Sequence, residues 1–117
     1  MGEETIFSKI IRKEIPADIV FQDDQLTVFK DIRPRRPVHL LIIPNYCIPS
    51  MNEVQDKDAE VLAKMMLVVP KLAQQFKLSS DGYRLIINCG QHGRQEVAHL
   101  HMHLIGGADC GPMVADI

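Results

Sequence analysis

Three histidines near the C-terminal end of the sequence, His99, His101 and His103, alternate with apolar residues. Successive side chains of a β-strand point to opposite faces, so this spacing predicts three imidazoles on one face and an apolar opposite face. An expression tag does not explain the pattern, because tags are contiguous and terminal. Imidazoles can bind a metal ion, carry protons or attack an electrophile. The spacing therefore indicates a metal-binding or catalytic site.

Two kinds of chemistry fit the alternating histidines. A metal site would use two of the rings and a ligand from another element, for which Glu96, His39 and Asp31 are candidates. A nucleophilic site would use the middle ring to attack phosphorus, while its neighbours donate hydrogen bonds to the phosphoryl oxygens. The spacing alone leaves both alternatives open.

The composition excludes several other classes of protein. The chain has 117 residues, 46% hydrophobic and 24% charged, which favours a single globular domain over residues 1–117 rather than a disordered chain. Its net charge of −2 gives no strong general attraction to nucleic acid or membranes. Three widely spaced cysteines favour reduced thiols. The acidic first residues lack the features of a signal peptide, and no apolar run reaches about 18 residues, so we expect a cytoplasmic protein.

Short apolar runs bounded by turn residues predict the strands that would carry these histidines. Antiparallel strands are expected at residues 19–22, 26–30, 38–43, 83–88 and about 95–105. The near-continuous apolar character of the third run predicts burial on both faces, which makes His39 conspicuous there.

Helical spacing predicts the remaining elements. Thr5 is a candidate N-cap for a short helix that ends by Ile15-Pro16. A longer helix is expected at about 56–76, with Met65 and Met66 filling the core and Pro70 producing a kink or a break in register. Together the elements predict an α+β fold, with an antiparallel sheet of about five strands, one long helix and one or two short ones.

The segment His99-Leu100-His101-Met102-His103-Leu104-Ile105 resembles the signature of the histidine triad (HIT) family. Other segments are similar to the Hint branch of that family: Thr5 to Ile11, Glu14-Ile15-Pro16, Asp31-Ile32-x-Pro34-x-x-Pro37-x-His39, Asp81 to Arg84, Asn88 and Gly93-x-Gln95. The resemblance implies a HIT-like fold and a homodimer that needs no metal or other cofactor. It implies a purine nucleoside phosphoramidase, which hydrolyses the P–N bond of adenosine or guanosine 5′-phosphoramidates.

The resemblance also implies a role for each candidate residue. His101 would attack the α-phosphorus and carry a covalent nucleotidyl intermediate, which water releases as the nucleoside monophosphate. His103 would hydrogen-bond the phosphoryl oxygens and assist proton transfer, and His99 and His39 would orient the nucleophilic ring. Asp31 would accept hydrogen bonds from the ribose hydroxyls. An apolar slot for the purine would be formed by Phe7, Ile10, Ile15, Ile32 and Leu41, and phosphate contacts would come from Asn88 and the backbone N–H groups of Arg94, Gln95, Glu96 and Val97.

Several residues depart from the family pattern. Arg94 stands where the family usually has glycine, so it would be strained at positive φ or would add a phosphate contact. Glu96 stands where many relatives have serine, and its carboxylate would repel phosphate unless it is protonated or donates a proton to the leaving amine. The basic loop of Arg33, Arg35 and Arg36 is either simply solvated or steers an anionic substrate.

Three other functions remain open at this point. A dinucleoside polyphosphate hydrolase would attack the same phosphorus but expel a phosphate. A nucleotide-binding interaction module would bind with little turnover, and a metal protein would use the triad as ligands.

Overall fold

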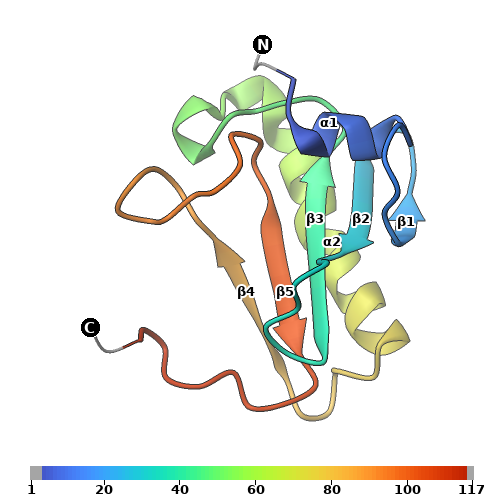
Figure 1. Cartoon of the computed structure of the whole chain (residues 1–117), viewed down its shortest axis with the longest axis vertical. Coiled ribbons are helices and arrows are strands. Elements are labelled where there is room, and N and C mark those ends of the chain that lie inside the picture. Colours follow the sequence, from blue (N-terminus) through green and yellow to red (C-terminus); the bar gives the residue numbers. More distant parts are fainter. Residues whose placement is uncertain (1–3, 116–117) are drawn as a thin grey trace.

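A five-stranded antiparallel sheet with the strand order β1-β2-β3-β5-β4 forms the centre of the computed structural model, which describes residues 4–115 (Figure 1). Its strands are β1 (Ile19–Gln22), β2 (Leu26–Lys30), β3 (Val38–Pro44), β4 (Tyr83–Ile87) and β5 (Met102–Gly106). The predicted α+β fold is confirmed, and the first four predicted strands are correct to within one residue. Residues 1–3, on which the expectation of no signal peptide partly depends, lie outside the described residues.

The last strand is shorter than predicted. It begins at Met102, and the chain from Gln95 to His101 is irregular. The backbone N–H of His99 donates to the carbonyl of Val97, and the N–H of Leu100 donates to the carbonyl of Ile48. These bonds turn the chain away from a strand ladder until Met102.

The short helix α1 (Ile6–Ile11) begins at the predicted cap. The side chain of Thr5 accepts hydrogen bonds from the backbone N–H groups of Phe7 and Ser8, and Ser8 Oγ accepts from the N–H of Thr5. The helix ends earlier than Ile15-Pro16, because Lys13 adopts a left-handed conformation with φ of 61°. Two short 3₁₀ turns, η1 (Met51–Glu53) and η2 (Asp56–Asp58), precede the long helix.

The long helix α2 (Ala59–Gln75) continues through Pro70 without the expected break in register, with the proline on its exposed side. Met65 is 2% exposed and fills the core as predicted, but Met66 is 54% exposed, so the expectation that it packs in the core is wrong. Adjacent helical residues point about 100° apart, and at this pair Met65 lies within the buried stripe of α2 while Met66 lies outside it. No helix within residues 4–115 is long and apolar enough to span a bilayer.

The two faces of the sheet pack against different helices. On one face, α2 crosses behind the strands (Figure 1) and packs on Leu40, Ile42, Met102 and Leu104. On the opposite face, Phe7 and Ile10 of α1 pack on a smaller cluster of Phe29, Leu41 and Ile43. Burying such side chains stabilises the fold by about 1.5–3 kcal/mol each. The residues that alternate with Met102 and Leu104 therefore point toward the α1 face.

Candidate active site

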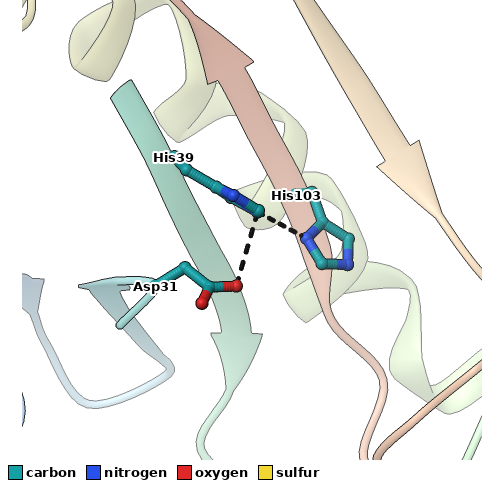
Figure 2. Close-up of side chains that lie close together, drawn as sticks. All are labelled: Asp31, His39 and His103. Carbon is teal, nitrogen blue, oxygen red and sulfur yellow. Dashed lines mark hydrogen bonds and ion pairs between the residues drawn. The ribbon is translucent and has the colours of Figure 1, made fainter. Parts of the chain in front are cut away.

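Four of the five histidines gather on the α1 face of the sheet. β3 pairs with β5 so that Leu41 lies opposite His103, which makes His39 a diagonal neighbour of His103. Nε2 of His39 lies 2.9 Å from Nδ1 of His103, and a dashed line in Figure 2 marks this contact. The ring centroids of His101 and His103 are 5.1 Å apart. The predicted shared face is therefore correct for His101 and His103, although His101 lies just before β5.

His99 lies before β5, outside the strand. Its imidazole makes no hydrogen bond with the imidazole of His101. Its side chain is fully buried, and Nε2 lies 2.9 Å from the carbonyl of Pro44. The Phe7 ring contacts both histidines edge-on, at centroid distances of 5.8 Å to His99 and 5.0 Å to His101. The carbonyl oxygen of His99 accepts a 2.7 Å hydrogen bond from Nδ1 of His101. The orienting contact expected from the His99 imidazole is thus made by the backbone of the same residue.

Hydrogen bonds assign the proton of each ring to one nitrogen. Nδ1 of His101 donates to a carbonyl, so Nε2 carries the lone pair. The backbone N–H of Arg35 donates to Nδ1 of His39 at 3.1 Å, so Nε2 of His39 carries the hydrogen that is donated to His103. Nδ1 of His103 accepts it, which leaves the hydrogen of that ring on Nε2. The site therefore presents a nucleophilic nitrogen on His101 and an N–H donor on His103.

Burial keeps these rings neutral. Desolvation lowers the pKa of His39, His99 and His101 below the ordinary 6.5. The pKa of His103 is lowered to about 4, mainly by desolvation and to a lesser extent by the neighbouring rings of His101 and His39. For His101, the carbonyl of His99 and the charges of Glu96 and Asp31 oppose the larger effect of burial. A neutral His101 has its lone pair available at pH 7 without first losing a proton.

An apolar cavity of about 280 Å³ opens beside His101. Its lining includes all five residues predicted for the purine slot, namely Phe7, Ile10, Ile15, Ile32 and Leu41. Asp31, Glu96, Val97, His101 and His103 line it as well. The side of the cavity formed by Ile32 is open, since this isoleucine is 86% exposed. The cavity suits a flat apolar group whose polar end reaches the histidines.

Asp31 lies at the start of the basic loop, with its two oxygens in different surroundings. Oδ1 accepts a 2.8 Å hydrogen bond from the backbone N–H of Arg33, which fixes the carboxylate in a turn. Oδ2 lies 3.5 Å from Nε2 of His39 (Figure 2). The carboxylate thus borders both the slot and the histidines.

The loop between β4 and β5 uses several of the predicted phosphate-contacting groups to hold its own shape. The side chain of Asn88 donates to the carbonyl of Gly93 at 2.7 Å. The backbone N–H groups of Arg94 and Gln95 donate to the carbonyls of Gln91 and Gly90. These two N–H groups are therefore not free for a phosphate, contrary to expectation. Those of Glu96 and Val97 are the remaining candidates.

The side chain of Gln95 braces the same loop and lines neither cavity of the site. Its Nε2 donates to the carbonyls of Pro49 and Val97, and its Oε1 accepts from the N–H of Gly90. Arg94 has φ of 59°, the left-handed conformation that favours glycine. The strain expected at this position is therefore present.

A second cavity of about 290 Å³ lies beside the slot. Asp31, Glu96 and His103 line both cavities, which therefore meet at these three residues. The rest of the second lining consists of Arg35, His39, Ile86, Asn88, Arg94 and Ile105. A larger cavity of about 540 Å³ is formed by the α2–β4 turn and the segment after β5, and it includes none of the predicted site residues.

Asp31, His39 and His103 also form a cluster that could hold a metal ion, since one ligand atom from each lies within 4.8 Å of the others. Two histidines and one carboxylate are a ligand set used for transition metals. In the structure, however, Nε2 of His39 and Nδ1 of His103 are joined by a hydrogen bond. An ion bound to these two nitrogens would have to replace that hydrogen.

Comparisons with known proteins identify the family of the chain. Residues 12–110 match the family model of the HIT domain. Over 115 residues the chain is 56% identical to the purine nucleoside phosphoramidase of Escherichia coli (strain K12), covering 98% of this chain and 97% of that protein. The crystal structure of a HIT family hydrolase from Legionella pneumophila Philadelphia 1 has a TM-score of 0.89 at 47% identity, covering 92% of this chain and 96% of that one. A HIT family hydrolase from Clostridium thermocellum has a TM-score of 0.91 at 40% identity, covering 98% of this chain and 100% of that one. The chain therefore belongs to the HIT domain family.

Proposed function

We propose that this protein is a purine nucleoside phosphoramidase, which hydrolyses the P–N bond of adenosine or guanosine 5′-phosphoramidates and releases the nucleoside monophosphate. The observation that carries the proposal is the neutral His101 ring, whose Nδ1 is bonded to a carbonyl so that Nε2 holds a lone pair beside the apolar slot. The 56% identity to a purine nucleoside phosphoramidase over nearly the whole chain supports the same activity.

In the first step, Nε2 of His101 attacks the α-phosphorus of a nucleotide whose purine lies in the slot. A bond forms between this nitrogen and phosphorus, the P–N bond to the amine breaks, and its electron pair goes to the amine nitrogen. The imidazole becomes cationic, and the carbonyl of His99 stabilises that charge through the Nδ1 hydrogen. Nε2–H of His103, held by His39, donates to a phosphoryl oxygen as negative charge develops there.

The leaving amine also needs a proton. Glu96 lines both cavities and so borders the junction of nucleotide and amine. We assign its carboxylate as the relay that takes a proton from solvent water and passes it to the amine nitrogen as the P–N bond breaks. In the second step, water attacks phosphorus, loses a proton through the Glu96 carboxylate to solvent and displaces His101, which returns to its neutral form with the Nε2 lone pair.

The test is AMP release from adenosine 5′-phosphoramidate by the purified protein at neutral pH. His101→Ala should abolish turnover and still bind AMP, because the slot is left intact. His92→Ala is the matched control, since His92 is exposed on the loop and lines neither cavity. Absence of AMP release by the wild type would overturn the proposal. Release of AMP from a diadenosine polyphosphate alone would favour the alternative hydrolase, and AMP binding without turnover of any substrate would favour a binding module.

We further propose a homodimer joined along β4. This strand lies at the edge of the sheet and presents the exposed apolar residues Tyr83 and Ile87, and α2 presents the exposed apolar residues Met66 and Leu67. Light scattering after size-exclusion chromatography should give twice the mass of the chain, and Ile87→Lys should shift it toward the monomer. A wild-type monomer at micromolar concentration would contradict this assembly. A single domain over residues 1–117 and a cytoplasmic location remain proposals, supported by the one continuous sheet and by the composition.

A further inference from the structure

The second cavity contains an asymmetric arrangement of charges. The two acidic residues of its lining, Asp31 and Glu96, also line the purine slot, so they lie at the junction of the two cavities. The two arginines, Arg35 and Arg94, line the second cavity alone. The part of this cavity away from the nucleotide is therefore cationic.

Neither of these arginines has its charge neutralised by a neighbour. Within residues 4–115, the salt bridges involve other basic side chains, and no carboxylate pairs with the guanidinium of Arg35 or Arg94. Arg36, by contrast, donates to the carbonyls of Asp109 and Arg35, and Arg84 donates to three carbonyls of the C-terminal segment. Arg35 and Arg94 can therefore offer their N–H groups to a ligand.

The loop holds the backbone of Arg94 in place despite its unfavourable conformation. Asn88 bonds to the carbonyl of Gly93, and a Cβ at Gly93 would lie only 2.4 Å from the carbonyl oxygen of Cys89. The chain is thus tightly packed directly before Arg94, which keeps φ at 59°. A disfavoured conformation that is retained beside a reaction site suggests a role for the side chain there.

The geometry of the reaction points from the slot toward this cavity. In phosphoryl transfer, the attacking and leaving atoms lie on opposite sides of phosphorus. His101 lines the slot only, whereas His103 lines both cavities. A phosphorus atom that is attacked by His101, and whose phosphoryl oxygen accepts a hydrogen bond from His103, would therefore direct its leaving amine toward the second cavity.

We propose that the second cavity binds the leaving group, and that Arg94, together with Arg35, makes the enzyme prefer amines that carry an anionic group, either a carboxylate or a phosphate. Guanidinium groups form paired hydrogen bonds with both anions. The inference rests on the proposed phosphoramidase activity and specifies its substrate class. Arg94 acts here as a specificity-determining residue and takes no part in the chemical step.

The test uses two pairs of adenosine 5′-phosphoramidates. The first pair carries β-alanine or its uncharged amide as leaving amine, and the second carries O-phosphoethanolamine or ethanolamine. The quantity measured is the ratio of kcat/KM for the anionic substrate to that for the neutral one. Comparing this ratio between variants cancels the intrinsic difference in reactivity between the substrates.

Arg94→Gln should lower this ratio by about fivefold in at least one pair, as expected for one charge-assisted contact in a solvent-exposed site. Arg94→Gly should lower it similarly, and glycine suits the φ of this position, so this variant is expected to fold. Arg33→Gln is the control. Arg33 is exposed on the neighbouring loop and lines neither cavity, and its substitution removes the same charge as Arg94→Gln.

The outcomes separate this inference from the proposed function. If none of the four substrates releases AMP, the phosphoramidase proposal itself fails. If they are hydrolysed but the ratios are the same in the wild type and both Arg94 variants, only the leaving-group inference is overturned. An equal fall of the ratio in Arg33→Gln would also overturn the inference, because the overall electrostatic field of the basic side chains, rather than a contact with Arg94, would then select the anion. The pair that responds identifies whether the preferred anion is a carboxylate or a phosphate.

Discussion

Lowering the pH from 7 to 5 is expected to destabilise the folded protein through His103. The pKa of this ring is lowered from 6.5 to about 4 in the folded state, mainly by burial. The unfolded chain therefore takes up a proton between these two values that the folded chain does not. The contribution of the neutral His103 ring to the free energy of unfolding is complete above pH 6.5 and is lost progressively as the pH falls toward 4.

The magnitude follows from the two pKa values. At pH 5 the unfolded ring is almost fully protonated and the folded ring is protonated in only about a tenth of the molecules, which corresponds to an upper limit of about 2 kcal/mol relative to pH 7. His103 is only partly buried, so solvent screening reduces this to about 1–2 kcal/mol.

The free energy of unfolding in urea, measured at pH 7 and at pH 5 and at one fixed protein concentration, reads this effect directly. The wild type should lose about 1–2 kcal/mol more between the two pH values than His103→Gln does. His92→Gln, which replaces an exposed histidine of the β4–β5 loop, should behave as the wild type. An equal loss in His103→Gln and the wild type would refute the argument that burial of this ring disfavours its protonation.

Three further outcomes are expected. Gly93→Ala should lower the free energy of unfolding in urea by about 2–3 kcal/mol, because its Cβ would lie 2.4 Å from the carbonyl oxygen of Cys89. Gly90→Ala is the control: its Cβ would have no atom within 4 Å, so it should cost only about 1 kcal/mol, from its φ of 70°. An equal loss of unfolding free energy in the two variants would contradict the clash at Gly93. Leu104→Ala should cost about 2–5 kcal/mol in the same measurement, since this side chain is fully buried against α2, and an unchanged midpoint would place it outside the core. In the pH profile, kcat/KM should be constant from pH 7 to 8. It should decrease only at pH values below the ordinary histidine pKa, where His101 becomes protonated. A decrease of kcat/KM as the pH rises above 7 would mean that the reactive ring must be cationic.

Much of the sheet could be predicted because the apolar runs are bounded by strong turn residues. The run from Val38 to Pro44 is buried along almost its whole length, as a near-continuous apolar strand should be. Helical periodicity placed Met65 correctly but not Met66, since the sequence does not specify how wide a stripe of α2 the sheet covers.

The start of the last strand could not be predicted from alternation. His99, His101 and His103 keep period two, but a bond from Leu100 to the distant Ile48 holds the preceding chain out of the ladder. No local pattern contains that long-range pairing. The resemblance to the HIT family indicated which side chains gather, whereas the roles of main-chain groups, such as the carbonyl of His99, became visible only in the structure.

The protons of the reactive histidines are assigned largely by groups that no side-chain substitution removes. The acceptor for His101 is the carbonyl of His99, and the donor to His39 is the backbone N–H of Arg35. A scan that replaces each residue by alanine would leave both groups in place. Grafting the histidines alone onto another sheet would transfer the rings without their tautomers. A redesigned phosphoramidase would have to copy the path of the main chain at these two points together with the histidines.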